Sequence, residues 1–319
     1  MQGRAVAEYR APLFLAWQLT NRCTARCIAC CEESGPDRGW PDELTRPEAL
    51  DLARRIVAAS IPYVAFGGGE PLGAPHCWEI FEILAAGGVA LKIETDGTRI
   101  DAAAADRLAR LGVQCIQVSV DGASSATHER VRPGGSFDAA TAAIRRLAAR
   151  GLAPQLVFVP TRSNIGEMAA TYDLAVELGC STFVTGPLMR IGRAAADWER
   201  IACGEAAWQE AAQTLRGHAR ARGTKTALAI YPWDILAELE ARLASPQAML
   251  LVVPNGKIKL LNALPFAPAD LRRDTLDQAW GSYCEAWRDP RVRGFVERCL
   301  KDPSLLRHAN ETWAPGSGY

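Results

Sequence analysis

The 319-residue sequence has no net charge, because 36 Lys and Arg offset 36 Asp and Glu. An even balance gives no electrostatic sign of a nucleic-acid or anionic-membrane partner. The chain also has no apolar run long enough to span a membrane, and its first ten residues, MQGRAVAEYR, contain no signal-peptide hydrophobic region. We therefore expect a cytoplasmic protein that binds neither nucleic acid nor membranes.

The cysteines are few and unevenly placed. Four of the ten lie within nine residues, as Cys23, Cys27, Cys30 and Cys31, while the other six are scattered singly. The cytosol keeps thiols reduced, so crowded cysteines there indicate a metal site rather than disulfides. Structural zinc usually needs a second pair of cysteines, and none follows at a suitable distance. Three thiolates on one loop can instead hold three irons of a [4Fe–4S] cluster and leave the fourth iron open, which we favour over zinc or unligated thiols.

Short apolar runs alternate with amphipathic stretches through the first 190 residues. The runs predict strands at residues 13–19, 63–66, 90–95, 115–120, 155–160 and 181–186. The stretches between them predict helices at residues 45–60, 77–88, 101–112, 137–151 and 166–179, the first opened by a Thr45–Glu48 capping box. Such β–α repeats predict a parallel sheet, doubly wound or barrel-like, with ligands bound at the carboxyl ends of its strands.

The pattern changes after residue 190. Helical segments at 204–223 and 232–245 precede a hairpin candidate at 249–263, whose Asn255-Gly256 pair is a strong turn signal. A Trp-rich helical segment follows at 275–287. We therefore predict two domains: residues 1–190, and a smaller α+β unit, residues 191–319, that covers the open end of the first.

Several motifs follow the predicted strands in order. They are Cys23-x3-Cys27-x2-Cys30, Gly68-Gly69-Glu70-Pro71, Thr95-Asp96-Gly97, Ser119-Val120-Asp121-Gly122 and 128-HERVRPGGSFD-138. Their order and spacing over residues 11–190 resemble the radical S-adenosylmethionine (radical SAM) superfamily, in the branch with a C-terminal SPASM or twitch domain. The resemblance implies an α/β fold, a partial (β/α)6 barrel followed by a smaller α+β domain.

The resemblance also implies residue roles. Cys23, Cys27 and Cys30 would ligate one [4Fe–4S] cluster whose open iron chelates SAM, and an external flavodoxin- or ferredoxin-type protein would supply the electron. The radical formed from SAM would then abstract hydrogen from a substrate. The positions implied for SAM are Gly68, Gly69 and Glu70 near its ammonium group, Thr95 and Ser119 near its carboxylate or ribose, and Asp121.

The sequence departs from this family pattern in two places. Ala29 stands where an aromatic residue usually lies by the adenine, so either another ring such as Trp40 covers the adenine or that contact is absent. The second part has only Cys203, Cys284 and Cys299, none paired, so it resembles a degenerate SPASM or twitch domain without an auxiliary cluster, although these three thiols could still gather one. Without that electron acceptor, a redox-neutral outcome such as epimerisation, elimination or decarboxylation is expected.

The substrate is less well defined by the sequence. Arg190, directly after the sixth predicted strand, is a candidate anchor for a substrate carboxylate or phosphate, and Cys203 is a candidate hydrogen donor. Only about a dozen residues precede the first strand, so we expect no fused peptide-recognition domain and favour a small molecule derived from a sugar, nucleoside or amino acid. The alternatives are a maturase of a ribosomal peptide delivered by a partner, a dehydrogenase with a residual auxiliary cluster, and a non-enzymatic iron–sulfur or SAM-binding regulator.

Overall fold

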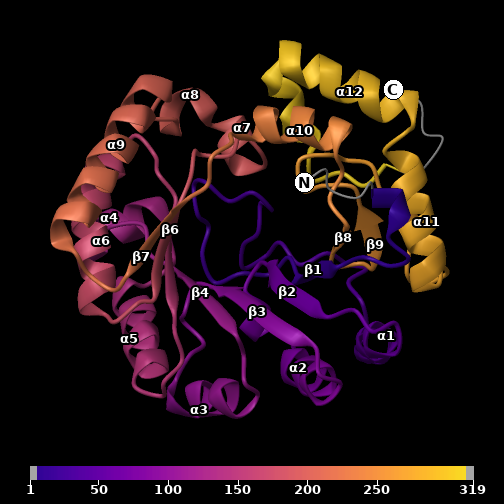
Figure 1. Cartoon of the computed structure of the whole chain (residues 1–319), viewed down its shortest axis with the longest axis horizontal. Coiled ribbons are helices and arrows are strands. Elements are labelled where there is room, and N and C mark those ends of the chain that lie inside the picture. The colour runs from indigo at the N-terminus through magenta and orange to yellow at the C-terminus, as the bar shows by residue number, and fades with distance from the viewer. Residues whose placement is uncertain (1–5, 314–319) are drawn as a thin grey trace.

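The computed structural model of the chain describes residues 6–313 (Figure 1). Its strands form one curved sheet in the order β10-β9-β8-β1-β2-β3-β4-β5-β6-β7. The strands are β1 (Phe14–Thr20), β2 (Tyr63–Gly68), β3 (Ala90–Thr95), β4 (Cys115–Ser119), β5 (Gln155–Phe158), β6 (Thr182–Thr185), β7 (Ala227–Ile230), β8 (Met249–Val252), β9 (Lys257–Lys259) and β10 (Ala269–Asp270).

Helices cover the outside of this sheet, and the strands surround an open centre in Figure 1. The helices of the first part are α1 (Arg46–Ala58), α2 (Cys77–Ala86), α3 (Ala102–Arg110), α4 (Ser125–Val131), α5 (Phe137–Ala148) and α6 (Met168–Glu177). Those of the second part are α7 (Arg193–Ala196), α8 (Trp198–Ile201), α9 (Glu205–Arg222), α10 (Ile235–Ala244), α11 (Leu276–Ala286) and α12 (Pro290–Lys301). Short 3-10 helices lie at Val6–Glu8, Pro71–Gly73, Ile165–Glu167 and Pro303–His308. No helix in the described part combines the length and hydrophobicity that a bilayer crossing needs.

The first six strands run parallel, each beside the next in sequence, as the β–α repeats predict. Their side chains alternate between two faces, so every second residue packs outward against the helices. On β1, for example, Leu15 and Trp17 are buried in the main apolar core, whereas Ala16 and Gln18 face the enclosed space. The α/β fold class and the partial barrel are confirmed.

The second part of the chain extends the same sheet at both ends. β7 pairs in parallel with β6, and β8 pairs in parallel with β1 and antiparallel with β9. The β8–β9 hairpin turns at Asn255-Gly256 as expected, with Gly256 at a φ of 82°. Residues 227–230 and the β8–β1 pairing have no counterpart in the sequence-based prediction, which gives six strands to the barrel. The division into domains at residue 190 stays a prediction.

Candidate active site

The cysteine loop, residues 21–35, leaves the carboxyl end of β1. Cys23, Cys27, Cys30 and Cys31 are all free thiols, and each is partly accessible. The backbone N–H of Cys23 donates to the carbonyl of Gly35 at 3.1 Å, and that of Cys30 donates to Cys27 at 3.3 Å. Hydrogen bonds therefore join the two ends of the loop, which follows β1 as the sequence predicts.

Two distant segments brace this loop by hydrogen bonds. The N–H groups of Arg26 and Ile28 donate to the carbonyls of Pro133 and Val131, at 2.7 and 2.9 Å. This contact gives the 128–138 motif a structural role, which is to support the cysteine loop. From the other side Arg193 donates to the carbonyl of Cys27 through Nη1 at 2.9 Å and to that of Cys30 through its backbone N–H at 3.0 Å.

Arg132 places a positive charge against a cysteine sulfur. Its Nη1 lies 3.6 Å from Sγ of Cys27, and its Nε donates to Oδ2 of Asp121 at 2.6 Å. Oδ1 of the same Asp121 accepts from the N–H of Val159 at 2.7 Å, so the carboxylate joins the ends of β4 and β5. Asp121 and Arg132 are 1% and 13% exposed, which leaves the pair little access to water. Asp121 thus holds a buried cation against the cysteine loop.

The electrostatics of the thiols test whether a metal cluster fits here. Burial raises the pKa of Cys23 to about 12, and the charge of Cys27 adds to the rise. Burial likewise raises the pKa of Cys27, with Arg132 opposing the rise and Cys30 adding to it. The charge on one thiolate therefore raises the pKa of its neighbour. A cationic group among the three would offset both the desolvation cost of the thiolates and their mutual repulsion.

The arrangement suits a cluster better than a single metal ion. No three His, Cys, Asp or Glu side chains in the described residues gather closely enough to hold one ion. A [4Fe–4S] cluster takes each cysteine on a different iron, so its ligands do not converge on one point. Three cysteines on one loop, whose thiolates would repel one another, with a guanidinium beside Cys27, fit such a cluster.

The glycines at the end of β2 are explained by contact with the cysteine loop. Gly69 donates to the carbonyl of Thr20 at 2.7 Å, and Glu70 donates to that of Arg22 at 2.8 Å. A Cβ atom at Gly69 would lie 1.9 Å from the carbonyl oxygen of Arg22, which no side chain can tolerate. Gly68 has a φ of 103°, a conformation that favours glycine. These two positions therefore let the loop pack directly on the strand end.

The Glu70 carboxylate is buried and accepts three hydrogen bonds. Its carboxylate accepts from the Leu72 N–H at 3.1 Å, the Thr95 hydroxyl at 2.8 Å and the Asp96 N–H at 2.8 Å. Burial raises its pKa well above the usual range, and the nearby Asp96 adds to the rise. Glu70 therefore ties the ends of β2 and β3 together, and its contribution to SAM binding stays a prediction.

The other positions expected to bind SAM also lie at strand ends. Thr95 bonds to Glu70 and accepts from the N–H of Gly97 at 3.0 Å. Both carboxylate oxygens of Asp121 are taken by Val159 and Arg132, as described above. Ser119 is partly exposed at the end of β4. Their roles toward SAM stay predictions.

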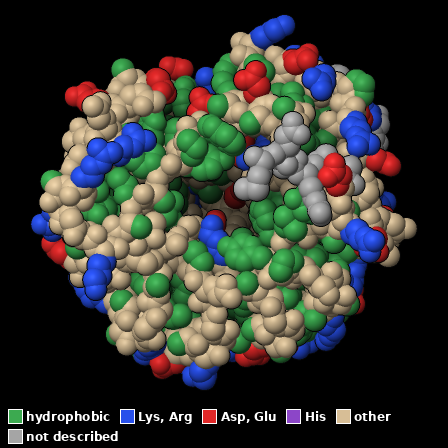
Figure 2. Space-filling model, viewed as in Figure 1, with side chains coloured by type: hydrophobic (Ala, Val, Ile, Leu, Met, Phe, Trp, Pro, Cys, Tyr) green, Lys and Arg blue, Asp and Glu red, His purple; other side chains and the backbone are tan. Residues whose placement is uncertain are grey.

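A cavity of about 560 Å³ lies at the centre of the curved sheet. Figure 2 shows its mouth as a hollow in the middle of this face. Ala29 and Cys31 of the cysteine loop line it together with Gly67 and Gly68 of β2. The loop, the glycine strand end and the enclosed space therefore meet in one site.

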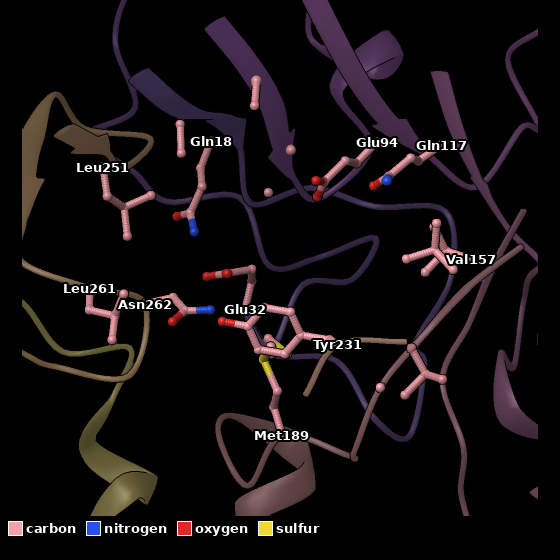
Figure 3. A pocket seen from close by; sticks show the side chains of 18 of the residues that line it. Gln18, Glu32, Glu94, Gln117, Val157, Met189, Tyr231, Leu251, Leu261 and Asn262 are labelled. Carbon is pink, nitrogen blue, oxygen red and sulfur yellow. The ribbon is translucent and has the colours of Figure 1, made fainter. Parts of the chain in front are cut away.

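Polar side chains from both parts of the chain enter this cavity (Figure 3). Glu94 and Gln117 come from β3 and β4, whereas Tyr231 and Asn262 come from the second part of the chain. Glu94 pairs with Lys92 at 2.6 Å. Glu238 likewise pairs with Arg242 at 3.3 Å. Glu32 of the cysteine loop also points into the cavity, and burial raises the pKa of its carboxyl. The Oγ1 atom of Thr185, which is 3% exposed, has no hydrogen-bond partner among the described residues and lines the same space.

The roles of the two candidate substrate residues stay predictions. Neither Arg190 nor Cys203 is among the described residues that line the cavity. Arg190 stacks over the Trp198 ring at 5.2 Å, and its Nε is buried without a hydrogen-bond partner in the described residues. Trp40 is not among the described residues that line the cavity; it borders a second hollow and packs against Met249 and Leu251.

Other residues of the site have weaker sequence signals. Lys92 and Glu94 alternate with Leu91 and Ile93 along β3, a period of two that indicates one apolar and one polar face. The bracing contacts of Arg132 and Arg193 have no local signal at all, because their partners are 105 and 166 residues away.

Comparison with known proteins agrees with this geometry. Residues 17–175 match the radical SAM superfamily. The mycofactocin maturase MftC of Mycobacterium ulcerans (strain Agy99) is 35% identical over 192 residues, which are 60% of this chain and 51% of the maturase. An AdoMet-dependent heme synthase of Methanosarcina barkeri (strain Fusaro / DSM 804) is 31% identical over 206 residues, covering 61% of this chain and 58% of the synthase. The chain thus spans about half the length of the curated relatives it matches.

Solved structures share the fold. SuiB of Streptococcus suis bound to S-adenosylmethionine superposes with a TM-score of 0.71 at 14% identity, over 93% of this chain and 72% of SuiB. Native anSMEcpe with bound AdoMet gives a TM-score of 0.63 at 16% identity, over 86% of this chain and 82% of that one. At such identities the likeness concerns the fold.

The curved parallel sheet, with a cysteine loop and a glycine-rich strand end around one cavity, defines an α/β enzyme that takes its ligands at the carboxyl ends of its strands. The chain belongs to the radical SAM superfamily of enzymes. The family predicted from the order of motifs is therefore confirmed.

Proposed function

We propose that this chain cleaves SAM reductively at a [4Fe–4S] cluster held by Cys23, Cys27 and Cys30, and directs the resulting radical at a peptide. One observation carries the proposal: the cysteine loop and the Gly67–Gly68 strand end line the same cavity. Cluster, SAM and substrate would then share one enclosed space. When bound, the cluster and SAM supply the radical that removes a hydrogen atom.

The chain's own residues would position these groups and exclude water. Arg132 and Arg193 hold the loop at Cys27. Gly68 and Gly69 would let the backbone approach SAM closely, with Thr95 and Ser119 adding hydrogen bonds. The apolar walls around Ala16, Val157, Met189 and Leu251 would keep water from the radical. A flavodoxin- or ferredoxin-type protein would deliver the electron, and a cytoplasmic location is part of the same proposal.

The choice of a peptide rather than a small molecule rests on the relatives and on the cavity wall. The MftC proteins are maturases, and the shared fold admits peptides, since one structure is SuiB bound to the precursor peptide SuiA. The cavity also presents the amide side chains Gln18, Gln117, Gln247 and Asn262, which can donate to and accept from peptide bonds. The small-molecule substrate favoured from the sequence is therefore the second candidate, supported by the heme synthase relatives.

The proposal also includes two features of residues 191–319: they form a degenerate SPASM or twitch-like domain, and they hold no auxiliary cluster. Cys203 follows α8, while Cys284 and Cys299 lie on α11 and α12. A redox-neutral outcome would follow from a single cluster.

Mass spectrometry can test the substrate class. The anaerobically reconstituted chain is given SAM, dithionite and, in turn, each short peptide encoded beside its gene. We expect one peptide to raise 5′-deoxyadenosine formation and to emerge with an altered mass or stereochemistry. Turnover of a sugar, nucleoside or tetrapyrrole, with every peptide unchanged, would contradict the peptide proposal.

A further inference from the structure

β7 is the last strand at one end of the sheet, and β6 is its neighbour among the described strands. The N–H groups of Ala227 and Tyr231 donate to β6-side carbonyls of Ser181 and Thr185, at 2.9 and 2.7 Å. Because these groups alternate in direction along a strand, the N–H and C=O groups of Leu228 and Ile230 point to the free side.

This edge is protected by its short length, since β7 has four residues, but its strand carries few of the other usual protections. Proteins shield edge strands by keeping them short or with charged residues, proline, bulges or a covering helix. The strand reads Ala-Leu-Ala-Ile, without a charge or proline, and both Ala227 and Ala229 are exposed. An accessible apolar edge of this kind can accept another extended chain by strand addition.

A basic hollow of about 440 Å³ adjoins the edge. Leu228 and Ile230 form one wall, and Arg216 and Arg220 on α9 form another. Both arginines are exposed, and neither has an acidic partner among the described residues. Lys225 is also exposed nearby. Figure 2 shows basic side chains over the flank of the molecule where Figure 1 places α9.

The same strand leads into the catalytic cavity. Tyr231 directly follows β7 and lines the central space, whereas Leu228 and Ile230 border the basic hollow. An extended chain paired along β7 would therefore end at the mouth of the cavity, with alternate side chains facing α9.

We propose that the free edge of β7 docks an extended acidic segment of the substrate peptide by strand addition, with its carboxylates facing Arg216 and Arg220. The inference rests on the proposed peptide substrate. It places binding of the acidic segment on a surface outside the cavity. The residues of the peptide that give affinity are then different from the residue that is modified.

A synthetic probe tests this without knowledge of the natural peptide. Fluorescein-labelled (Glu-Val)4 is titrated with the full chain, and fluorescence anisotropy reports binding. We expect saturable binding that Arg216→Glu/Arg220→Glu weakens at least about tenfold, because the reversed charges repel the probe. The matched reversal Arg54→Glu/Arg110→Glu, on exposed arginines of α1 and the end of α3, should leave affinity unchanged.

Two further measurements separate strand addition from simple charge attraction. Leu228→Pro removes an N–H from the free edge and leaves the β6 side of the ladder intact, and it should also weaken binding about tenfold. A probe N-methylated at alternate valines should show the same loss with the unchanged protein, which covers the case that the proline variant does not fold.

Three results would overturn the inference. The first is no saturable binding of (Glu-Val)4, and the second is equal affinity for the N-methylated and the unmethylated probe. The third is a single-stranded oligonucleotide that binds more tightly than (Glu-Val)4 and loses its binding in the Arg216→Glu/Arg220→Glu variant. Reductive cleavage of SAM by the unchanged protein is measured in parallel. If cleavage occurs while the probe does not bind, the docking surface is wrong and the SAM chemistry stands; if cleavage is absent, the proposed function itself fails.

Discussion

Replacing Arg132 with leucine should lower the reduction potential of the cluster. The guanidinium lies 3.6 Å from the sulfur of Cys27, and its side chain is only 13% exposed. A positive charge this close favours the added electron, so its removal makes the potential more negative. The Asp121 carboxylate that stays behind, 2.6 Å from the lost Nε position, acts in the same direction.

The size of the effect follows from Coulomb's law. Two unit charges about 4 Å apart interact by about 4 kcal/mol at an effective dielectric constant of about 20. The cluster spreads its charge over several atoms, so we take roughly half of this, about 2 kcal/mol. At about 59 mV per tenfold change for one electron, this corresponds to a shift of about 90 mV.

Redox titration followed by electron paramagnetic resonance measures this shift directly. Arg132→Lys retains the charge and should recover most of the potential. Arg26→Leu is the matched control, because Arg26 lies on the same loop but is 53% exposed and pairs with Asp37 at 2.9 Å. We expect the control to move the potential by less than about 20 mV, since water screens an exposed charge. A fully loaded Arg132→Leu variant with an unchanged potential would refute the argument.

Two other predictions concern the site and its support. Gly69→Ala should prevent loading of iron and destabilise the fold, because the new methyl group would lie 1.9 Å from the carbonyl oxygen of Arg22. Iron analysis measures the first effect and urea unfolding the second. Gly281→Ala is the control, because a methyl group there meets nothing within 4 Å. Burial lowers the pKa of His128 to about 4 from 6.5, so the folded state resists protonation. Stability should therefore fall as the pH drops from 6.5 toward 4, by up to about 3 kcal/mol from this residue. Urea midpoints of His128→Gln should show a weaker acid dependence, and an identical dependence in both proteins would contradict the buried neutral imidazole.

The barrel could be predicted from the sequence because its first six strands are β-rich apolar runs separated by five amphipathic helical stretches. β7 could not, since four residues, Ala227–Ile230, between two helices carry no periodic signal. The β8–β1 pairing was equally hidden, because it joins residues 249–252 to the start of the chain through long-range contact. Local patterns reveal elements, whereas pairing depends on the whole chain.

The site divides in the same way. The cysteine spacing and the glycines at the end of β2 are local, so the sequence revealed both. Arg193 and Asn310 meet the loop only in the folded chain; the Asn310 side chain donates to the carbonyl of Cys31 at 2.8 Å across 279 residues. Arg190 was favoured for its place after β6; it stacks on Trp198 and is not among the described residues that line the cavity, so its role toward the substrate stays a prediction.

The central claim is that Cys23, Cys27 and Cys30 hold one cluster that cleaves SAM. Its most direct test is anaerobic reconstitution followed by counting of iron and sulfide and measurement of 5′-deoxyadenosine formed with dithionite and SAM. We predict about four irons per chain and product formation that is lost when all three cysteines become alanine, while Cys31→Ser retains both. Product from the triple variant, or about eight irons in the unchanged chain, would contradict the account.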